Sequence, residues 1–356
     1  MREDQIIDDI DEEVDDFLSQ NERFEHHRFV VDKGQSLVRI DKYLVNCMPN
    51  ISRNRIQEAA EAGTILVNDF PVKSNYRVKP QDVISIVLDY PKSDYSIVAQ
   101  DIPLDVVYED ADLIVINKQP NLVVHPGFGN FDGTLLNAVA WHLKDDPNFD
   151  ANDPRLGLVH RIDKDTSGLI LVAKNESAKA KLSLQFFHKT TERTYNALVW
   201  GVVKEEEGTI VGALARDPRD RMLFTVFSEG ENPAAKHAVT HYKVLERFAY
   251  VTLVECRLET GRTHQIRVHM KHIGHTLFND ERYGGNEPLR GVTSAKYKQF
   301  VKNCFDVCPR QALHARTLGF VHPTTDKWMQ FDSPLPEDIN NVLNKWRKYS
   351  PNNLQD

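Results

Sequence analysis

The chain of 356 residues lacks several features that mark whole classes of proteins. It has no apolar run close to the roughly 18 residues that a membrane-spanning helix needs. It has no glycine-rich loop of the kind that cradles nucleotide phosphates. Its four cysteines, Cys47, Cys256, Cys304 and Cys308, suggest neither a disulfide framework nor a zinc-binding set. These absences argue against a membrane protein and against a secreted, disulfide-stabilised protein.

The chain also lacks a net positive charge: 44 lysines and arginines are outnumbered by 52 acidic residues, and the net charge is −8. Residues 1–22 hold ten acidic residues and one arginine, a net of −9, so the remainder of the chain carries +1. We expect residues 1–27 to form a disordered acidic tail. Such an acidic amino terminus is unlike a secretory signal, and we expect a reduced, cytoplasmic protein.

One stretch, residues 158–174, concentrates ionisable residues beside an apolar run. Five of them occupy six positions: His160, Arg161, Asp163, Lys164 and Asp165. The run 169–173, bounded by Gly168 and Lys174, is typical of a buried strand. Charges at the mouth of a buried strand are costly unless they are paired or used. We therefore interpret this stretch as a functional loop presented by a rigid scaffold.

Two other interpretations of the stretch stay open on its residues alone. Asp163, Asp165, Ser167 and Gly168 match positions 1, 3, 5 and 6 of an EF-hand calcium loop. The first three of these positions supply ligands, and the fourth is the glycine of a sharp turn. The last ligand position of that loop should be a bidentate glutamate, and it is Lys174 here. A plain polar surface turn is the second alternative.

Residues 261–272, GRTHQIRVHMKH, form a further motif with helical spacing. Ile266, Met270 and Ile273 share one face of the expected helix, which leaves Arg267 and Lys271 together on another. Three histidines in the motif invite a metal hypothesis: His264, His269 and His272. They lack an acidic partner at the metalloprotease spacing, so we expect no metal site.

Residues 160–169, HRIDKDTSGL, resemble the signature of the RluA-type pseudouridine synthases, in which a His-Arg-Leu-Asp pattern carries the catalytic aspartate. By position that residue is Asp163. Residues 193–201 resemble the family's Tyr-x-Ala-x-Val-x-Gly element, whose active-site tyrosine is Tyr195 here. The resemblance also implies that Arg267 is the basic residue that pairs with the aspartate. Without it, a tyrosine in a strand is more often a core residue.

Residues 117–126, NKQPNLVVHP, resemble the family's first motif with two departures. Gln119 stands where the family usually has proline, and Asn121 where it usually has glycine. Asn279 replaces a usual glycine in a later motif. Asparagine tolerates a left-handed backbone better than most residues, so these turns can survive.

Residues 36–90 form a separate module that resembles the S4 RNA-binding domain. Two short helices, the first ended by Pro49 and the second capped by Ser52 and closed by Gly63, precede short strands. Arg53 and Arg55 lie in the first turn of a helix, where cations are disfavoured by roughly a few tenths of a kcal/mol. This cost suggests a phosphate ligand. Two solvated arginines are the alternative.

The expected fold class is α+β: a small S4 RNA-binding domain followed by a pseudouridine synthase domain with a mixed, largely antiparallel central sheet flanked by helices. We expect a linker at 91–101 and the catalytic domain at 102–348. Within the latter we predict an amphipathic helix at 176–190 with Ala180, Leu184 and Phe187 on one face. We also predict an irregular insert at 286–308 and a closing helix at 336–348.

The resemblance implies isomerisation of specific uridines in large-subunit ribosomal RNA, as in the S4-bearing family members. The reaction detaches uracil from ribose, turns it and rejoins it through carbon. It requires one carboxylate and no metal or redox cofactor, so we expect no cofactor. Desolvation would raise the pKa of Asp163, and Arg267 is expected to keep it ionised. The alternatives are an enzyme acting on transfer RNA and an inactive RNA-binding assembly factor.

Several residues are expected to contact RNA. Arg161 is separated from Asp163 by Ile162 alone, so a strand-like backbone would point both side chains to one face. The resemblance implies that Arg161 fills the gap left by an extruded base. We also assign RNA contacts to Lys42, Arg53, Arg55, Arg262 and His264. The expected partner is therefore RNA, with no membrane or metal partner, and the expected state is a monomer.

Overall fold

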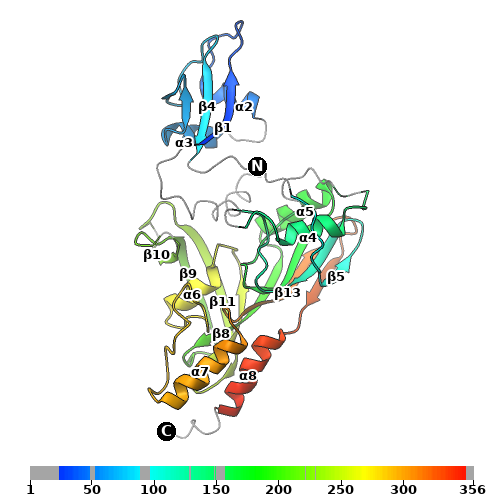
Figure 1. Cartoon of the computed structure of the whole chain (residues 1–356), viewed down its shortest axis with the longest axis vertical. Helices are drawn as coiled ribbons and strands as arrows, with labels where there is room; N and C mark the ends of the chain where they lie inside the picture. Colours follow the sequence, from blue (N-terminus) through cyan, green and yellow to red (C-terminus); the bar gives the residue numbers. More distant parts are fainter. Residues whose placement is uncertain are drawn as a thin grey trace. The chain divides into compact units, whose positions relative to one another are not determined.

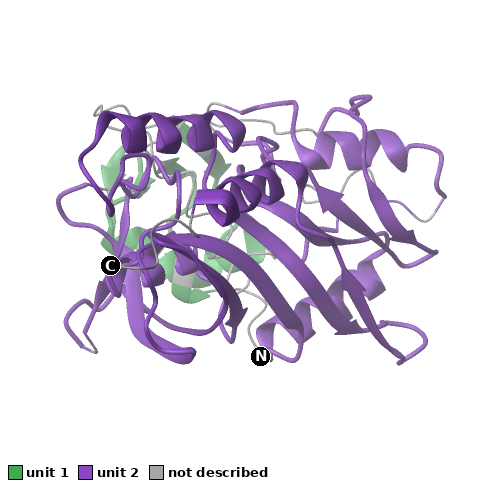
Figure 2. Ribbon diagram, turned by 90° about the horizontal axis from the view of Figure 1, so that it is seen from below, with its two compact units in different colours: residues 1–95 green, residues 96–356 purple. Residues whose placement is uncertain are grey.

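The computed structural model describes residues 24–48, 53–88, 97–127, 130–147, 149, 157–220, 222–228 and 230–349. Figure 1 shows the chain with the element labels used below. It divides into two compact units, Met1–Tyr95 and Ser96–Asp356, which Figure 2 colours separately. Every helix within the described residues is too short or too polar to cross a bilayer.

The first unit packs two helices, α2 (Ile40–Cys47) and α3 (Arg53–Glu61), against a small antiparallel sheet. The strands are β1 (Phe24–Val30), β2 (Ile65–Val67), β3 (Phe70–Pro71) and β4 (Val83–Leu88), in the order β1-β4-β2-β3. Ile40 and Leu44, one helical turn apart on α2, are fully buried in one core with Ile65 and Ile84.

The expected tail, residues 1–27, extends too far along the chain. Residues 24–27 belong instead to β1, which begins at Phe24 and pairs with β4 through Val30. Residues 24–30 contain one acidic residue, Glu25, so this segment lacks the charge density that keeps a tail unfolded. The rest of that tail, residues 1–23, lies outside the described residues. So do Ser52 and residues 91–96 of the expected linker.

The second unit is built on a ten-stranded sheet in the order β10-β9-β11-β12-β8-β13-β7-β6-β5, with β14 paired to β13. Its strands are β5 (Val106–Glu109), β6 (Leu113–Lys118), β7 (Ser167–Ala173), β8 (Glu192–Trp200), β9 (Glu207–Arg216), β10 (Phe224–Phe227), β11 (Lys236–Arg247), β12 (Val251–Leu258), β13 (Leu313–Val321) and β14 (Trp328–Asp332). The pair β7–β13 is parallel and the other pairs are antiparallel, which confirms the expected mixed sheet.

Helices cover both faces of this sheet because successive strand side chains point to opposite faces. On β6, Ile114 and Ile116 pack in one core with α4 (Leu135–His142). Leu113 and Val115 pack on the other face with α5 (Glu176–Phe187). Further along the sheet, α6 (Gln265–His272) covers one face, while α7 (Ala295–Val307) and α8 (Glu337–Tyr349) cover the other.

Two predictions about helices are wrong. The buried face of α5 carries Ala178 and Leu182, whereas Leu184 and Phe187 of the predicted apolar face are exposed. The predicted irregular insert contains α7, a helix of 13 residues with Ser294 as its N-cap. Its apolar residues at helical spacing bury one face of α7 against α8 in the same core: Tyr297, Val301 and Cys304.

Candidate active site

Residues 159–166, named here the aspartate loop, lead directly into β7, which lies inside the sheet between β6 and β13. All seven residues of β7 are buried. At its start Gly168 has a φ of +113°, and any side chain there would overlap the carbonyl group of Ala315 on β13. Glycine is therefore required for the parallel pairing that anchors the end of the loop.

Asp163 in this loop contacts a buried guanidinium supplied by α6. Arg267 Nη1 donates to Asp163 Oδ2 at 3.0 Å. The same guanidinium donates through Nε and Nη2 to the two carboxylate oxygens of Asp280, at 2.7 and 2.8 Å. Asp280 is fully buried, and its bidentate contact fixes the plane of the guanidinium so that Nη1 faces Asp163.

Asp280 is a residue of the site that the sequence did not single out. It lies next to Asn279, whose φ of +57° shows the left-handed turn expected at that position. Asn121 shows the same conformation, with a φ of +61°. The available signal for Asp280 was an acidic residue just after the apolar pair Leu277 and Phe278, both fully buried.

The pKa of Asp163 is lowered from 3.8 to about 2. Burial acts in the opposite direction and would raise it, but the electrostatic interactions with His264, Arg267 and Arg161 and the hydrogen bond from Arg267 outweigh burial. Burial lowers the pKa of His264 itself to about 3, so this imidazole is neutral at pH 7. Arg267 and Arg161 are therefore the cations that keep Asp163 ionised near neutrality.

Tyr195 lies on β8 with 6% of its surface exposed. It belongs to a hydrophobic cluster with Ile162, the neighbour of Asp163, and Ile266, the neighbour of Arg267. Burial raises the pKa of Tyr195; the charge of Arg193 opposes this rise and that of Asp163 adds to it. The structure thus brings together all three residues expected to be catalytic.

Lys118, at the end of β6, holds the backbone of the aspartate loop. Its ammonium group is buried and donates to the carbonyl oxygens of Gln119, Leu122 and Lys164, at 2.9, 2.9 and 2.8 Å. Burial lowers the pKa of Lys118 to about 7, although the charges of Asp165 and Asp163 oppose that shift. The contact with Lys164 ties the first sequence motif to the residue after Asp163.

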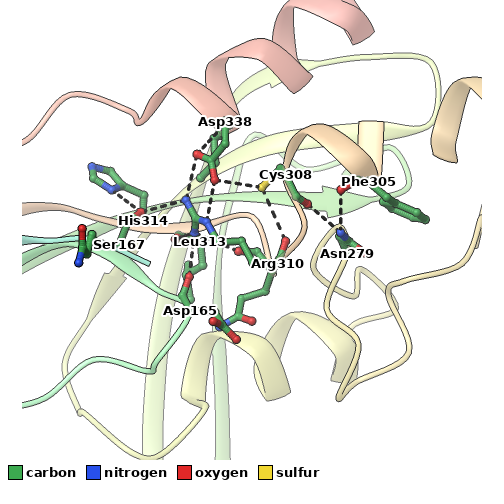
Figure 3. Close-up of polar contacts among 12 residues, drawn as sticks. Asp165, Ser167, Asn279, Phe305, Cys308, Arg310, Leu313, His314 and Asp338 are labelled. Carbon is green, nitrogen blue, oxygen red and sulfur yellow. Dashed lines mark hydrogen bonds and ion pairs between the residues drawn. The ribbon is translucent and has the colours of Figure 1, made fainter. Parts of the chain in front are cut away.

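Arg310 holds the next carbonyl of the same loop from the other side. Its Nη1 donates to the carbonyl oxygen of Asp165 at 2.8 Å. Its Nε and Nη2 form a bidentate ion pair with Asp338 of α8, at 2.8 and 3.1 Å, and Nη2 also donates to Ser167 Oγ at 3.1 Å. Figure 3 shows the Arg310 guanidinium between Asp338 and Asp165. Two buried side-chain donors, from Lys118 and Arg310, therefore fix successive peptide groups beside Asp163.

His264 and Tyr283 form a wall of the site behind Arg267. The ring of Tyr283 lies 4.9 Å from the guanidinium carbon of Arg267, and its hydroxyl bonds His264 Nδ1 at 2.8 Å. His264 is buried and has a left-handed backbone, with a φ of +55°. This burial favours a structural role for His264 over the expected direct contact with RNA.

Arg161 and Arg262 lie at the surface of the second unit. Burial alternates from half-buried Arg161 to buried Ile162 to half-buried Asp163, as a strand-like backbone would produce. Arg161 is close enough to lower the pKa of Asp163. Arg262 is half-buried and donates from Nε to the carbonyl oxygen of His237 at 3.3 Å.

The expected RNA contacts of the first unit differ in their surroundings. Lys42 is exposed on α2. Arg53 donates through Nε and Nη2 to Asp41, at 3.1 and 2.9 Å, and Asp41 also accepts bonds from Arg39 and Gln57. Burial would raise the pKa of Asp41, but these three partners hold it well below its usual range. Asp41 thus offsets the cost of a cation in the first turn of α3, and the side chain of Arg55 lies outside the described residues.

Among the described residues, one group of donors could approach a metal ion: Asp110, Asp112 and His322, with ligand atoms within 4.8 Å of one another. They lie at the opposite end of β6 from Lys118. Asp110 already accepts hydrogen bonds from the Tyr108 hydroxyl, from two backbone amides and from His322 at 2.8 Å. These bonds account for the group as a tie between β6 and β13.

The sheet, the covering helices and the polar centre around Asp163 define the class of protein. Residues 112–272 match the family model described as RNA pseudouridylate synthase, and residues 38–84 match the S4 domain. An uncharacterized RNA pseudouridine synthase of Chlorobaculum parvum is 47% identical, covering 89% of this chain and 96% of that protein. The chain belongs to the RNA pseudouridylate synthase family, whose members isomerise uridine in RNA.

Within this family the chain is similar, along most of its length, to enzymes named for the large ribosomal subunit. Ribosomal large subunit pseudouridine synthase D of Xylella fastidiosa is 41% identical, covering 90% of this chain and 92% of that protein. Among solved structures, human RNA pseudouridylate synthase domain containing 4 gives a TM-score of 0.55 at 22% identity, covering 68% of this chain and 92% of that chain. That likeness supports the fold alone.

Proposed function

We propose that this enzyme modifies uridines in large-subunit ribosomal RNA and that Asp163 is its catalytic carboxylate. The names of relatives such as the Xylella fastidiosa enzyme support the substrate. One observation supports the catalytic assignment above all others. Asp163 is 20% exposed, so a substrate can reach it, and it is ion-paired with a guanidinium whose orientation is fixed by Asp280.

The chemistry follows from an ionised carboxylate in a partly dry site. Asp163 acts as a nucleophile toward the base or the sugar, or as a base at the sugar. Tyr195 offers an aromatic face on which the uracil ring stacks. A base in structured RNA is itself stacked and has to be extruded first. Arg161 fills the vacated space, since a guanidinium is planar enough to stack and charged enough to hold phosphate.

The test is to map pseudouridine in transcripts of large-subunit ribosomal RNA and of transfer RNAs after incubation with the purified full chain. We expect product in the ribosomal transcripts and none in the transfer RNAs, with Asp163→Asn as the inactive control. Product confined to transfer RNA would replace the substrate assignment. Equal product from wild type and Asp163→Asn would overturn the catalytic assignment.

A further inference from the structure

Three arginines among the described residues are at least nine-tenths buried: Arg193, Arg267 and Arg310, with 8%, 5% and 7% of their surface exposed. Two of them are paired with carboxylates, Arg267 with Asp163 and Asp280, and Arg310 with Asp338. Arg193 differs, since its guanidinium forms neither a hydrogen bond nor an ion pair with any residue that the structure describes. Its Nε is completely buried without a hydrogen-bond partner.

Neutral groups hold the Arg193 guanidinium in place. Its carbon lies 5.3 Å from the centre of the Phe186 ring, whose other neighbour is His160, stacked at 4.5 Å between ring centres. On another side Gly261 comes so close that a Cβ there would lie 3.0 Å from Nη1. Burial and the charge of Arg193 lower the pKa of His160 to about 3, so this imidazole is neutral at pH 7. The cation is therefore rigidly placed but not neutralised.

The guanidinium lies beside the aspartate loop. Arg193 and Tyr195 are two residues apart on β8, so their side chains point to the same face of the sheet. Both its charge and that of Asp163 act on Tyr195. His160, on the far side of Phe186, is the second residue of the loop. Nε is the guanidinium nitrogen that is completely buried without a partner, and the exposed 8% of Arg193 leaves its terminal nitrogens not completely buried.

A buried cation without an anion is costly, and arginine cannot relieve that cost by losing its proton. Such a group persists where a ligand completes it. RNA brings one negative charge per nucleotide, and the guanidinium fork matches a phosphate better than any other side chain does. We propose that Arg193 binds a backbone phosphate of the RNA beside the target uridine. This inference rests on the proposed function, because it takes Asp163 and Tyr195 as the place where uracil binds.

The charge of Arg193 argues for a phosphate and against an oxygen of the uracil ring. Uracil is neutral, and a neutral acceptor would leave the buried charge uncompensated. A phosphate compensates the charge and holds the strand in register while the base enters the site. Arg193 is thus a positioning residue for the substrate, distinct from Arg161, whose proposed place is within the base stack.

The test measures the affinity of a uridine-containing stem-loop of large-subunit ribosomal RNA at several potassium chloride concentrations. Arg193→Gln should bind roughly tenfold to a hundredfold more weakly than wild type. Its plot of log Kd against log salt should be shallower by about 0.7 to 0.9, the contribution of one phosphate. Arg193→Lys should keep the wild-type slope. Arg347→Gln, which removes an exposed arginine paired with Glu246, is the charge-matched control and should change neither quantity.

Two further measurements keep the inference falsifiable. Without RNA, the thermal midpoint of Arg193→Gln should equal or exceed that of wild type, because an unpaired buried charge is removed; a marked drop would show a structural role. Methylphosphonate substitution of single phosphates should reveal one that matters to wild type and not to Arg193→Gln. An unchanged salt slope, or no such phosphate, overturns the inference. If wild type does not modify the parent stem-loop, the proposed function fails instead.

Discussion

Both sides of the aspartate loop are held by a buried arginine, but the two arginines hold different groups. Arg267 contacts the carboxylate of Asp163, and its second partner is Asp280. Arg310 contacts the backbone carbonyl of Asp165, and its carboxylate partner is Asp338. A cation beside a carboxylate changes both its charge state and its position, whereas a cation beside a carbonyl fixes position alone. Losses on the Arg267 side should therefore depend on pH, and losses on the Arg310 side should not.

The largest effect is expected from Asp163→Asn, which removes the carboxylate from the Arg267 side and leaves the Arg310 side intact. Turnover should fall by roughly a thousandfold or more, measured in single-turnover assays with ribosomal RNA. The variant should still fold at pH 7, and its RNA affinity should change little because the two side chains have nearly the same volume. Asp165→Asn is the matched control, since the carbonyl that Arg310 binds is unchanged, and it should stay within a few-fold of wild type.

The next effect concerns Arg267 itself. Arg267→Leu alone would leave fully buried Asp280 unpaired, at a cost of about 3–5 kcal/mol in folding stability. The double variant Arg267→Leu/Asp280→Asn avoids that cost and isolates the effect on Asp163. Burial, which raises the pKa of Asp163, is then no longer opposed by the charge and hydrogen bond of Arg267. Turnover near neutral pH should fall by about a hundredfold, and part of it should return as pH rises.

The measurement for this double variant is the pH profile of single-turnover rates. Under the proposed mechanism only ionised Asp163 is active, so the rate should climb with pH through the raised pKa and then level off. A profile parallel to that of wild type would show that Arg267 orients the substrate and does not set the charge of Asp163.

A smaller loss is expected on the Arg310 side. Asp338→Asn removes the charge that orients the Arg310 fork, so the carbonyl of Asp165 and with it the loop should shift. A displacement of about 1 Å near the chemistry costs up to roughly a hundredfold in rate, and we expect a loss of ten- to a hundredfold. This loss should be the same at every pH. Asp306→Asn, on the exposed face of α7, is the control. If the rate of Asp338→Asn recovered at high pH, the expected difference between the Arg267 side and the Arg310 side would be contradicted.

The smallest effect is on stability in acid. The folded-state pKa of Asp163 is about 2 against an ordinary value of 3.8, so its ionised form stabilises the fold at pH values above 3.8. That contribution is lost as pH falls through about 2. The shift corresponds to about 2 kcal/mol. In urea unfolding, wild type should exceed Asp163→Asn by this amount at pH 7, and the gap should close toward pH 2. A gap that is constant with pH would contradict the assigned ion pair.

Much of the fold follows from local patterns in the sequence. The apolar run before Lys174, the helical spacing of Ile266 and Met270, and the left-handed asparagines at 121 and 279 all appear in the structure as predicted. The face of α5 was misjudged because this helix carries apolar residues all round. Only packing on β7 and β13 decides that Leu182 is buried and Leu184 is not.

The groups that hold the site could not be predicted in the same way. The family motifs pair Asp163 with Arg267, but the donors that hold the backbone of the aspartate loop come from distant parts of the chain. Lys118 reaches a carbonyl 46 residues away, and Arg310 reaches one 145 residues away. A backbone carbonyl has no sequence signature, so such contacts are visible only in three dimensions. The unpaired state of Arg193 could not be predicted either, because the absence of a partner leaves no pattern in the sequence.

The distance along the chain between Arg310 and Asp165 has a consequence for the protein during its synthesis. At about 5–20 residues per second, roughly 7 to 30 seconds separate the appearance of Asp165 from that of Arg310. Through that interval β7 has β6 as a neighbour but not β13, and the aspartate loop is held by Lys118 and, once it has been made, by Arg267, but not yet by Arg310. The S4 unit, whose described elements end at Leu88, is by then already made. A nascent chain therefore carries its S4 unit well before Arg310 can bind the Asp165 carbonyl, and the ion pair that orients Arg310 forms only once Asp338 of α8 has been made.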